Sequence, residues 1–249
     1  MTELNLFAGP PSSAGAETFR DHNKRLGPRP RGDRALIDTL DRSGLVGRGG
    51  ASFPVGVKWR SVESRSRGAA VVIANGAEGE PLSRKDRTLM ALRPHLVIDG
   101  ALLAADAVGA SRTLLYIGEA HGAAAAAMAR ALAERPRAEL ARTTLLGAPP
   151  SYVAGEETAA VNFVNSGVAA PQAIPPRPFE RGVDGRPTLV QNVESLAHAA
   201  LIARHGDAWF QSLGRRMMAG PRKDSARSLH HFPRYPFTEP CAIRGERIR

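Results

Sequence analysis

Apolar and polar residues alternate along the middle of the chain in blocks that favour strands and helices in turn. The run AAVVIA at 69–74 is continuously apolar and ends at Asn-Gly, which is typical of a buried strand in a parallel sheet. Apolar runs at 113–117 and 143–146 predict two further strands. Helical patterns predict helices at 35–43, 94–108, 123–134, 156–164 and 193–204. This alternation predicts an α/β domain with a mainly parallel sheet.

The two ends of the chain lack this regular pattern. Residues 1–33 hold four prolines among scattered polar residues, so we expect a flexible extension with a short helix near 17–24. Residues 34–212 form the expected α/β domain. Residues 213–249 carry nine Lys or Arg and three Asp or Glu without sustained periodicity. We expect this basic tail to be disordered or the product of a frameshift.

A natural extension that contacts an acidic partner or nucleic acid is the alternative for the basic tail, because basic runs attract phosphates. No recognisable nucleic-acid-binding motif accompanies the tail, so a nucleic-acid partner is not expected.

Composition narrows the class of protein. The chain has 249 residues, 43% of them hydrophobic, a formal charge of +10, and one cysteine, Cys241. One cysteine cannot supply the roughly four ligands of an iron–sulfur cubane, so no cluster is expected in this chain. The apolar stretch at 96–110 is interrupted by Asp99 and Asp106 and is too short to span a membrane. No signal-peptide pattern is present, so we expect a cytoplasmic protein that does not itself span a membrane.

The segment GRGGASFPVGVKW at 47–59 is the first candidate for chemistry. Its four glycines allow backbone N–H groups to approach an anion without obstruction by a Cβ atom. Arg48 and Lys58 add positive charge beside the same loop. The segment therefore predicts a loop that holds the phosphate of a nucleotide-like cofactor; a flexible surface loop is the alternative reading of this segment by itself.

Three later motifs extend the candidate site. NGAEGEPLSRKDR at 75–87 follows the first predicted strand, at the carboxyl end where open α/β sheets bind ligands. YVAGEETA at 152–159 places Glu156 and Glu157 after a glycine, where they could also cap a helix. GRPTLVQNVES at 185–195 contains Asn192, which could be a helix N-cap.

In their order and spacing, these four motifs resemble one family over roughly residues 40–210. It is the flavin-bearing NADH dehydrogenase subunit of respiratory complex I, with relatives in NAD-linked hydrogenases and formate dehydrogenases. The resemblance implies a Rossmann-like FMN-binding domain that takes a hydride from NADH and passes electrons to a partner. That partner would be another electron-transfer subunit or a ferredoxin-like protein. No catalytic base is implied, because hydride transfer depends on placing the reacting atoms.

The resemblance also implies roles for individual residues. Phe53, Glu80 and Glu157 would contact the nicotinamide nucleotide, with Phe53 stacked on its adenine. The residues that match the family's FMN site are Gly47, Arg48, Gly49, Gly50, Lys58, Asn75, Glu78, Tyr152, Gly155, Glu156, Val190, Asn192 and Ser195.

Several positions depart from the family pattern. Ala77 stands where the family has an acidic residue. Ile174 and Arg177 replace a lysine and an aromatic residue associated with the dinucleotide, and Ser61 replaces a second aromatic residue. The predicted FMN site is thus mostly intact, whereas the NADH site has lost contacts.

Two alternatives to an NADH dehydrogenase stay open, and only the first follows from these departures. One is a flavin electron-transfer module that is served by a ferredoxin-like partner without NADH. The other is a truncated, non-catalytic product, because the ubiquitin-like and iron–sulfur domains of related subunits have no counterpart in this sequence.

Overall fold

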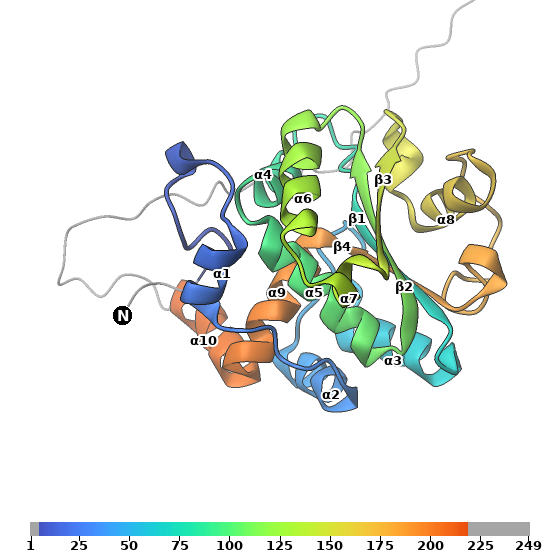
Figure 1. Cartoon of the computed structure of the whole chain (residues 1–249). Helices are drawn as coiled ribbons and strands as arrows, with labels where there is room; N and C mark the ends of the chain where they lie inside the picture. Colours follow the sequence, from blue (N-terminus) through green and yellow to red (C-terminus); the bar gives the residue numbers. More distant parts are fainter. Residues whose placement is uncertain (1–4, 219–249) are drawn as a thin grey trace, which may run out of the picture.

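A four-stranded parallel sheet forms the centre of the protein, which a computed structural model describes from residue 5 to residue 218. The strand order is β3-β2-β1-β4, so β1 lies between β2 and β4 (Figure 1). All three pairings are parallel, which confirms the predicted α/β class. The strands are β1 (Ala70–Gly76), β2 (Ala110–Gly118), β3 (Thr143–Ala148) and β4 (Thr188–Asn192).

Both faces of β1 are buried, which explains its continuous apolar sequence. Val72 and Ala74 point into the larger hydrophobic core, whereas Val71 and Ile73 point into a smaller one on the other face. The sheet is therefore the middle layer of three.

The helices are distributed unequally over the two faces. Helices α2, α3, α4, α5, α6 and α9 contribute to the larger core, and α8 contributes to the smaller core across the sheet (Figure 1). Helix α2 packs mainly against α3 and also contacts α9, α10 packs on α2 and α9, and α1 packs on α5. The bounds are α1 (Phe19–Leu26), α2 (Arg34–Ser43), α3 (Val55–Ser66), α4 (Lys85–Leu92), α5 (Pro94–Ala107), α6 (Gly122–Ala133), α7 (Arg137–Leu140), α8 (Glu157–Ser166), α9 (Val193–His205) and α10 (Asp207–Met218), with 3-10 turns η1 (Ser12–Ala14), η2 (Tyr152–Gly155) and η3 (Val183–Gly185).

Helices α5 and α9 approach each other closely beneath the sheet. A Cβ atom on Gly100 would lie 2.1 Å from the backbone oxygen of Leu196, so the contact requires glycine. Almost every residue of α5 is buried. Since α9 follows β4 directly, this contact fixes the position of the α9 N-terminus relative to the sheet.

The N-terminal segment is packed more closely than the expected flexible extension. The short helix predicted near 17–24 is present as α1, and its His22 is fully buried. His22 Nε2 lies 2.9 Å from Asp99 Oδ2, and Nδ1 lies 3.4 Å from Glu17 Oε2. Buried Arg93 donates to the backbone oxygens of Phe7 and Ala8 at 2.8 and 3.0 Å. Described residues before the α/β core are therefore part of the packed structure.

The described helices include none that could cross a membrane alone. Helices α4 and α5 reach the necessary apolar length only as a pair, and they are bent by 101°. From the sequence we expected an irregular tail from residue 213 onward, whereas α10 continues to Met218. The remainder of that tail, including Cys241, lies outside the described residues.

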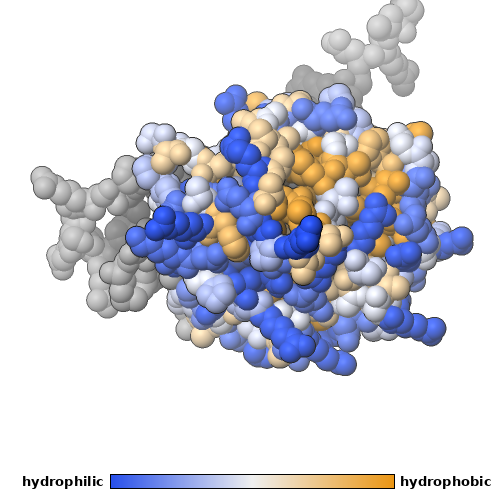
Figure 2. Space-filling view, in the orientation of Figure 1, coloured by the Kyte–Doolittle hydropathy of each residue, from blue (hydrophilic) through white to orange (hydrophobic). Residues whose placement is uncertain are grey.

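Apolar surface gathers between α6 and α8, where the edge strand β3 lies (Figures 1 and 2). Leu145 and Leu146 of β3 are only partly buried and pack against the two cores on opposite faces of the sheet. Hydrophilic residues cover much of the rest of the face that Figure 2 shows.

Candidate functional site

The four sequence motifs meet at the carboxyl edge of the sheet, beside β1 and β4. The chain runs from β1 to β2 and β3 on one side, and β4 pairs with β1 on the other side. The strand order therefore reverses between β1 and β4, and open α/β sheets bind ligands at such a switch point. β1 ends at Gly76 and β4 ends at Asn192 on this edge.

The glycine loop is closed at its base and rests on the start of α9. Gly47 N–H donates to Phe53 O at 2.8 Å, which joins the two ends of the loop. Arg48 N–H donates to Ser195 Oγ at 2.9 Å. A Cβ atom on Gly49 would lie 3.5 Å from Asn192 Cβ, so the loop backbone runs directly over the N-cap of α9. A glycine loop on a helix N-terminus is a favourable place for an anion.

Lys58 connects this loop region to the third motif. It lies in the first turn of α3, which begins after Pro54, and its Nζ is 2.8 Å from Glu157 Oε2 at the start of α8. The Lys58 and Glu157 side chains are partly exposed, at 24% and 29%. A ligand phosphate could therefore reach Lys58 in competition with Glu157.

Asn75 connects the end of β1 to the same motif. Its Nδ2 donates to Gly155 O at 2.7 Å, and its Oδ1 accepts from Ala77 N–H at 3.2 Å. A Cβ atom on Gly79 would lie 2.5 Å from Tyr152 O, so the loop after β1 touches η2 through bare backbone. The second and third motifs thus form one continuous wall.

Two predicted cofactor residues make helix-capping contacts. The Glu156 carboxylate accepts from the backbone N–H groups of Thr158 and Ala159, both at 2.9 Å, as the capping alternative proposed. The Glu78 carboxylate accepts from Asp86 and Arg87 N–H groups at the start of α4, and its side chain is 2% exposed. In this structure both carboxylates accept hydrogen bonds from backbone N–H groups at the start of a helix.

Asn192 lies at the centre of a polar cluster between α4 and α9. Its Oδ1 accepts from Glu194 N–H at 3.0 Å, which makes it the N-cap of α9, and its Nδ2 donates to Asp86 Oδ2 at 2.7 Å. Lys85 Nζ lies 2.7 Å from Asp86 Oδ1 and 3.0 Å from Glu194 Oε2. The N-cap interpretation of Asn192 is confirmed.

Burial and charge set the ionisation of this cluster. Burial raises the pKa of the Asp86 carboxyl to about 6, although Lys85 and Asn192 oppose the shift. Burial opposes ionisation of Glu194 as well, but the nearby imidazole of His198 and the charge of Lys85 lower its pKa to about 2. The pKa of Lys85 is raised, because its two carboxylate neighbours outweigh the effect of burial.

Exposed side chains surround the outer part of the site. Phe53 is 50% exposed and Tyr152 is 68% exposed, so both rings can be reached by a ligand. Tyr152 donates its hydroxyl to Glu80 Oε1 at 2.9 Å. Flat aromatic surfaces of this kind suit stacking against a base or an isoalloxazine ring.

The four residues that depart from the family pattern lie in different parts of the structure. Ala77 is buried in the smaller core. Ser61 lies on α3, and its Oγ donates to Val57 O at 2.9 Å. Ile174 is exposed, and Arg177 N–H donates to Glu180 Oε2 at 2.9 Å within its own loop.

Gln191 is a candidate residue that the sequence motifs did not single out. It is buried, and its Oε1 has no hydrogen-bond partner among the described residues. Its Nε2 lies 4.0 Å from the position that a Cβ atom on Gly47 would occupy. A buried amide oxygen without a partner, beneath a loop of bare backbone, fits a site completed by a polar ligand. The residues present therefore fit a phosphate-bearing flavin.

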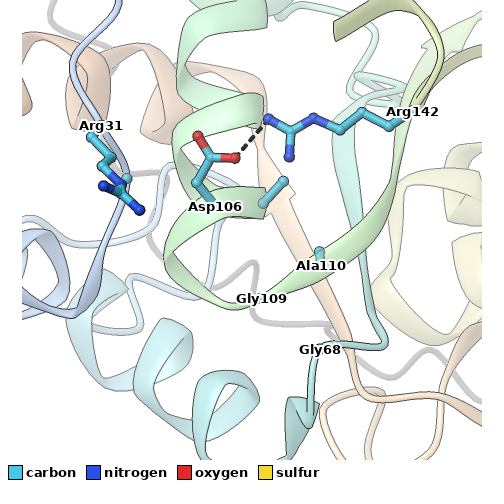
Figure 3. Close-up of a pocket in the computed structure, with 8 residues that line it drawn as sticks. Arg31, Gly68, Asp106, Gly109, Ala110 and Arg142 are labelled. Carbon is cyan, nitrogen blue, oxygen red and sulfur yellow. Dashed lines mark hydrogen bonds and ion pairs between the residues drawn. The ribbon is translucent and has the colours of Figure 1, made fainter. Parts of the chain in front are cut away.

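A hollow lies at the opposite, amino-terminal edge of the sheet (Figure 3). It measures about 480 Å³, and Arg31 and Arg142 flank it, with Asp106 accepting from Arg142 at 2.6 Å. Gly109 and Ala110 place it where β2 begins, far from the four motifs along the strands. The described residues contain no group of three or more His, Cys, Asp or Glu that could hold a metal ion.

Curated proteins of known family are similar to this chain in sequence. The chain is 34% identical over 196 residues to the subunit designated F of the NADH-quinone oxidoreductase of Rickettsia bellii, which covers 74% of this chain and 47% of that protein. The corresponding Escherichia coli protein is 33% identical over 199 residues, and the match covers 75% of this chain and 45% of that protein. The chain thus spans about half the length of these curated relatives.

A solved structure and a family profile agree with these relatives. A chain of NAD+-reducing [NiFe]-hydrogenase in its H2-reduced state superposes with a TM-score of 0.62 at 37% identity, covering 70% of this chain and 31% of that one. The profile of the Nuo51 FMN-binding domain matches residues 40–200, which contain all four motifs. These matches confirm the predicted family, and FMN is the cofactor that the family's description names. The chain belongs to the Nuo51 FMN-binding domain family.

Proposed function

We propose that this chain binds FMN at the carboxyl edge of its sheet, accepts a hydride from NADH and passes electrons to a partner protein. The observation that carries the proposal is the convergence of four separate motifs at the switch point between β1 and β4. Membership of an FMN-binding family supports the choice of cofactor.

The phosphate end of the cofactor is assigned to the glycine loop and the α9 N-terminus. Backbone N–H groups at Gly49 and Gly50 and the ammonium of Lys58 would hold the phosphate. The partial positive charge of the α9 N-terminus adds to these donors. Asn75, Val190 and the buried amide of Gln191 would line the path from the phosphate toward the ring system.

The nicotinamide nucleotide is assigned to the exposed side of the site. FMN, when bound, supplies the hydride-accepting chemistry and the ability to release electrons one at a time. The chain's own task is placement: the exposed Phe53 ring would stack on a base, and Glu80 and Glu157 would orient polar groups. No side chain is assigned the role of a base.

The proposed reaction needs an acceptor for the electrons that leave the flavin. We assign this role to an electron-transfer subunit or a ferredoxin-like protein. The names of the relatives, a component of NADH-quinone oxidoreductase and an NAD+-reducing hydrogenase, support such a partner.

A second candidate keeps the flavin but removes NADH from the reaction. Ile174, Arg177 and Ser61 replace residues that the family associates with the dinucleotide. In that case a ferredoxin-like protein would supply the electrons that NADH supplies in the first proposal.

Anaerobic titration separates these candidates. The purified chain is first titrated with FMN while quenching of flavin fluorescence is followed. The loaded protein then receives NADH, and in a parallel sample reduced ferredoxin. Bleaching of the oxidised flavin spectrum by NADH supports the dehydrogenase, bleaching by ferredoxin alone supports the second candidate, and a folded chain that takes up no FMN contradicts both.

A further inference from the structure

We propose that Lys85 sets the affinity of the site for the FMN phosphate, by neutralising two carboxylates that flank the α9 N-terminus. This inference rests on the proposed function, because it names the residue that makes that helix end suitable for an anion. Lys85 acts through Asn192 and Glu194 and is therefore a positioning residue.

The first argument is the placement of the ammonium between the carboxylates. Lys85 Nζ lies 2.7 Å from Asp86 Oδ1 and 3.0 Å from Glu194 Oε2. Asp86 is buried, and the Glu194 side chain is 18% exposed, so water screens neither charge effectively. Without Lys85, one face of the phosphate site would consist of two carboxylates that share a poorly solvated space.

The second argument is the orientation of Asn192. Lys85 Nζ lies 3.5 Å from Asn192 Oδ1, the atom that also caps α9 by accepting from Glu194 N–H. Asn192 Nδ2 donates to Asp86 Oδ2 at 2.7 Å. Together these contacts fix the amide of Asn192 with its oxygen toward the start of α9. The glycine loop lies against the same side chain, because a Cβ atom on Gly49 would lie 3.5 Å from Asn192 Cβ.

The other charges around the cluster do not replace Lys85. Arg48 Nε is 3.9 Å from Glu194 Oε1, and His198 Nε2 is 3.7 Å from the same oxygen, both longer than a hydrogen bond. On the α4 side, Arg87 faces Glu78 at 3.5 Å and so balances a different carboxylate. Lys85 is the one cation among the described residues that contacts both Asp86 and Glu194 within 3.0 Å.

The test compares FMN with riboflavin, which has the same ring and ribityl chain but no phosphate. The dissociation constants of both are measured by fluorescence quenching for the wild-type chain, Lys85→Met, Glu194→Gln and the double variant. Lys24→Met is the matched control, because exposed Lys24 on α1 makes the same change of charge away from the site.

We expect Lys85→Met to weaken FMN binding about tenfold, which corresponds to about 1.4 kcal/mol, and riboflavin binding less than twofold. Glu194→Gln alone should strengthen FMN binding, and in the double variant it should restore most of the loss. Lys24→Met should bind both flavins like the wild type.

Equal weakening of FMN and riboflavin by Lys85→Met would mean that Lys85 only supports the fold, and would overturn the inference. FMN binding unchanged in both Lys85→Met and Glu194→Gln would overturn it as well. A folded wild-type chain that binds neither flavin would instead overturn the proposed function, and this inference with it. If Lys85→Met does not fold, the response of Glu194→Gln decides the question by itself.

Discussion

Lys58 and Glu157 form an ion pair of 2.8 Å, although 99 residues separate them in the chain. Lys58 belongs to the glycine-loop motif, and Glu157 begins α8 in the third motif. The resemblance assigns the lysine to FMN and the glutamate to the nicotinamide nucleotide. In the described state each partner is paired with the other, so under the proposed function a ligand that binds either side chain would compete with this ion pair.

Glu157→Gln should therefore strengthen FMN binding, because the phosphate no longer competes with a carboxylate for Lys58. A partly exposed pair contributes up to about 1 kcal/mol, so the expected gain is roughly two- to fivefold in the dissociation constant. Lys58→Met should weaken FMN binding. Riboflavin affinity, measured in the same fluorescence assay, is the control and should change in neither variant; FMN binding that Glu157→Gln weakens would contradict the competition.

Gly100→Ala should destabilise the fold severely. The added methyl group would lie 2.1 Å from the Leu196 carbonyl, so α5 and α9 would have to move apart. Overpacking of a rigid core contact costs about 3 kcal/mol, which urea unfolding would measure. Gly122→Ala, at the start of α6, is the matched control, since nothing lies within 4 Å of its new Cβ atom. Equal stability of the two variants would contradict the close approach of these helices.

Acid should destabilise the protein through the buried carboxylates of Glu17 and Asp99. Burial alone would raise both pKa values, but His22 and Arg25 lower that of Glu17 to about 2. Hydrogen bonding to His22 and the charge of Arg135 hold the pKa of Asp99 well below its usual range. Since both folded pKa values lie below those of the unfolded chain, the unfolded chain takes up more protons as pH falls.

The stabilisation is consequently present above about pH 4 and is lost as pH falls from there toward pH 2. Thermal midpoints measured from pH 7 downward should stay nearly constant to about pH 4 and drop steeply below it. Asp99→Asn should lose about 3 kcal/mol at neutral pH, because His22, Arg135 and Arg204 all lose their carboxylate partner, and its pH dependence should be flatter. A wild-type midpoint that stays constant down to pH 3 would exclude this role.

Arg93→Met should release the described N-terminal residues without unfolding the sheet. The buried guanidinium holds the backbone oxygens of Phe7, Ala8 and Pro10, and methionine can donate to none of them. Hydrogen exchange at residues 7–17 should become markedly faster, whereas exchange in β1 should be unchanged. Arg20→Met, an exposed change on α1, should leave both regions as in the wild type.

The sequence predicted those elements whose own pattern determines them. The strand at 69–74 and the helices at 35–43, 94–108 and 123–134 appear within one or two residues of their expected bounds. Helix α3 was missed, although Val55, Trp59 and Val62 recur at helical spacing and are all buried. The glycines and charges of the neighbouring loop obscured that signal, and β4 is too short to be recognised by period alone.

The candidate site was predicted through its motifs, but the partners of its residues were not. Nothing in the local sequence indicates that Lys58 faces Glu157, or that Asn192 bonds to Asp86 across 106 residues. The buried network at His22 is of the same kind, since Asp99 lies 77 residues further along the chain. Such contacts depend on the packing of whole elements, which periodicity and composition do not specify.

The hydrogen bond from Arg48 to Ser195 spans 147 residues, which has a consequence for the order of events during synthesis. The glycine loop leaves the ribosome long before the helix on which it rests exists. Closing so long a loop is entropically costly, so the contact forms only once the intervening strands have assembled. We therefore expect the nascent chain to acquire its flavin late, after α9 has emerged and docked, as one of the last steps of its maturation.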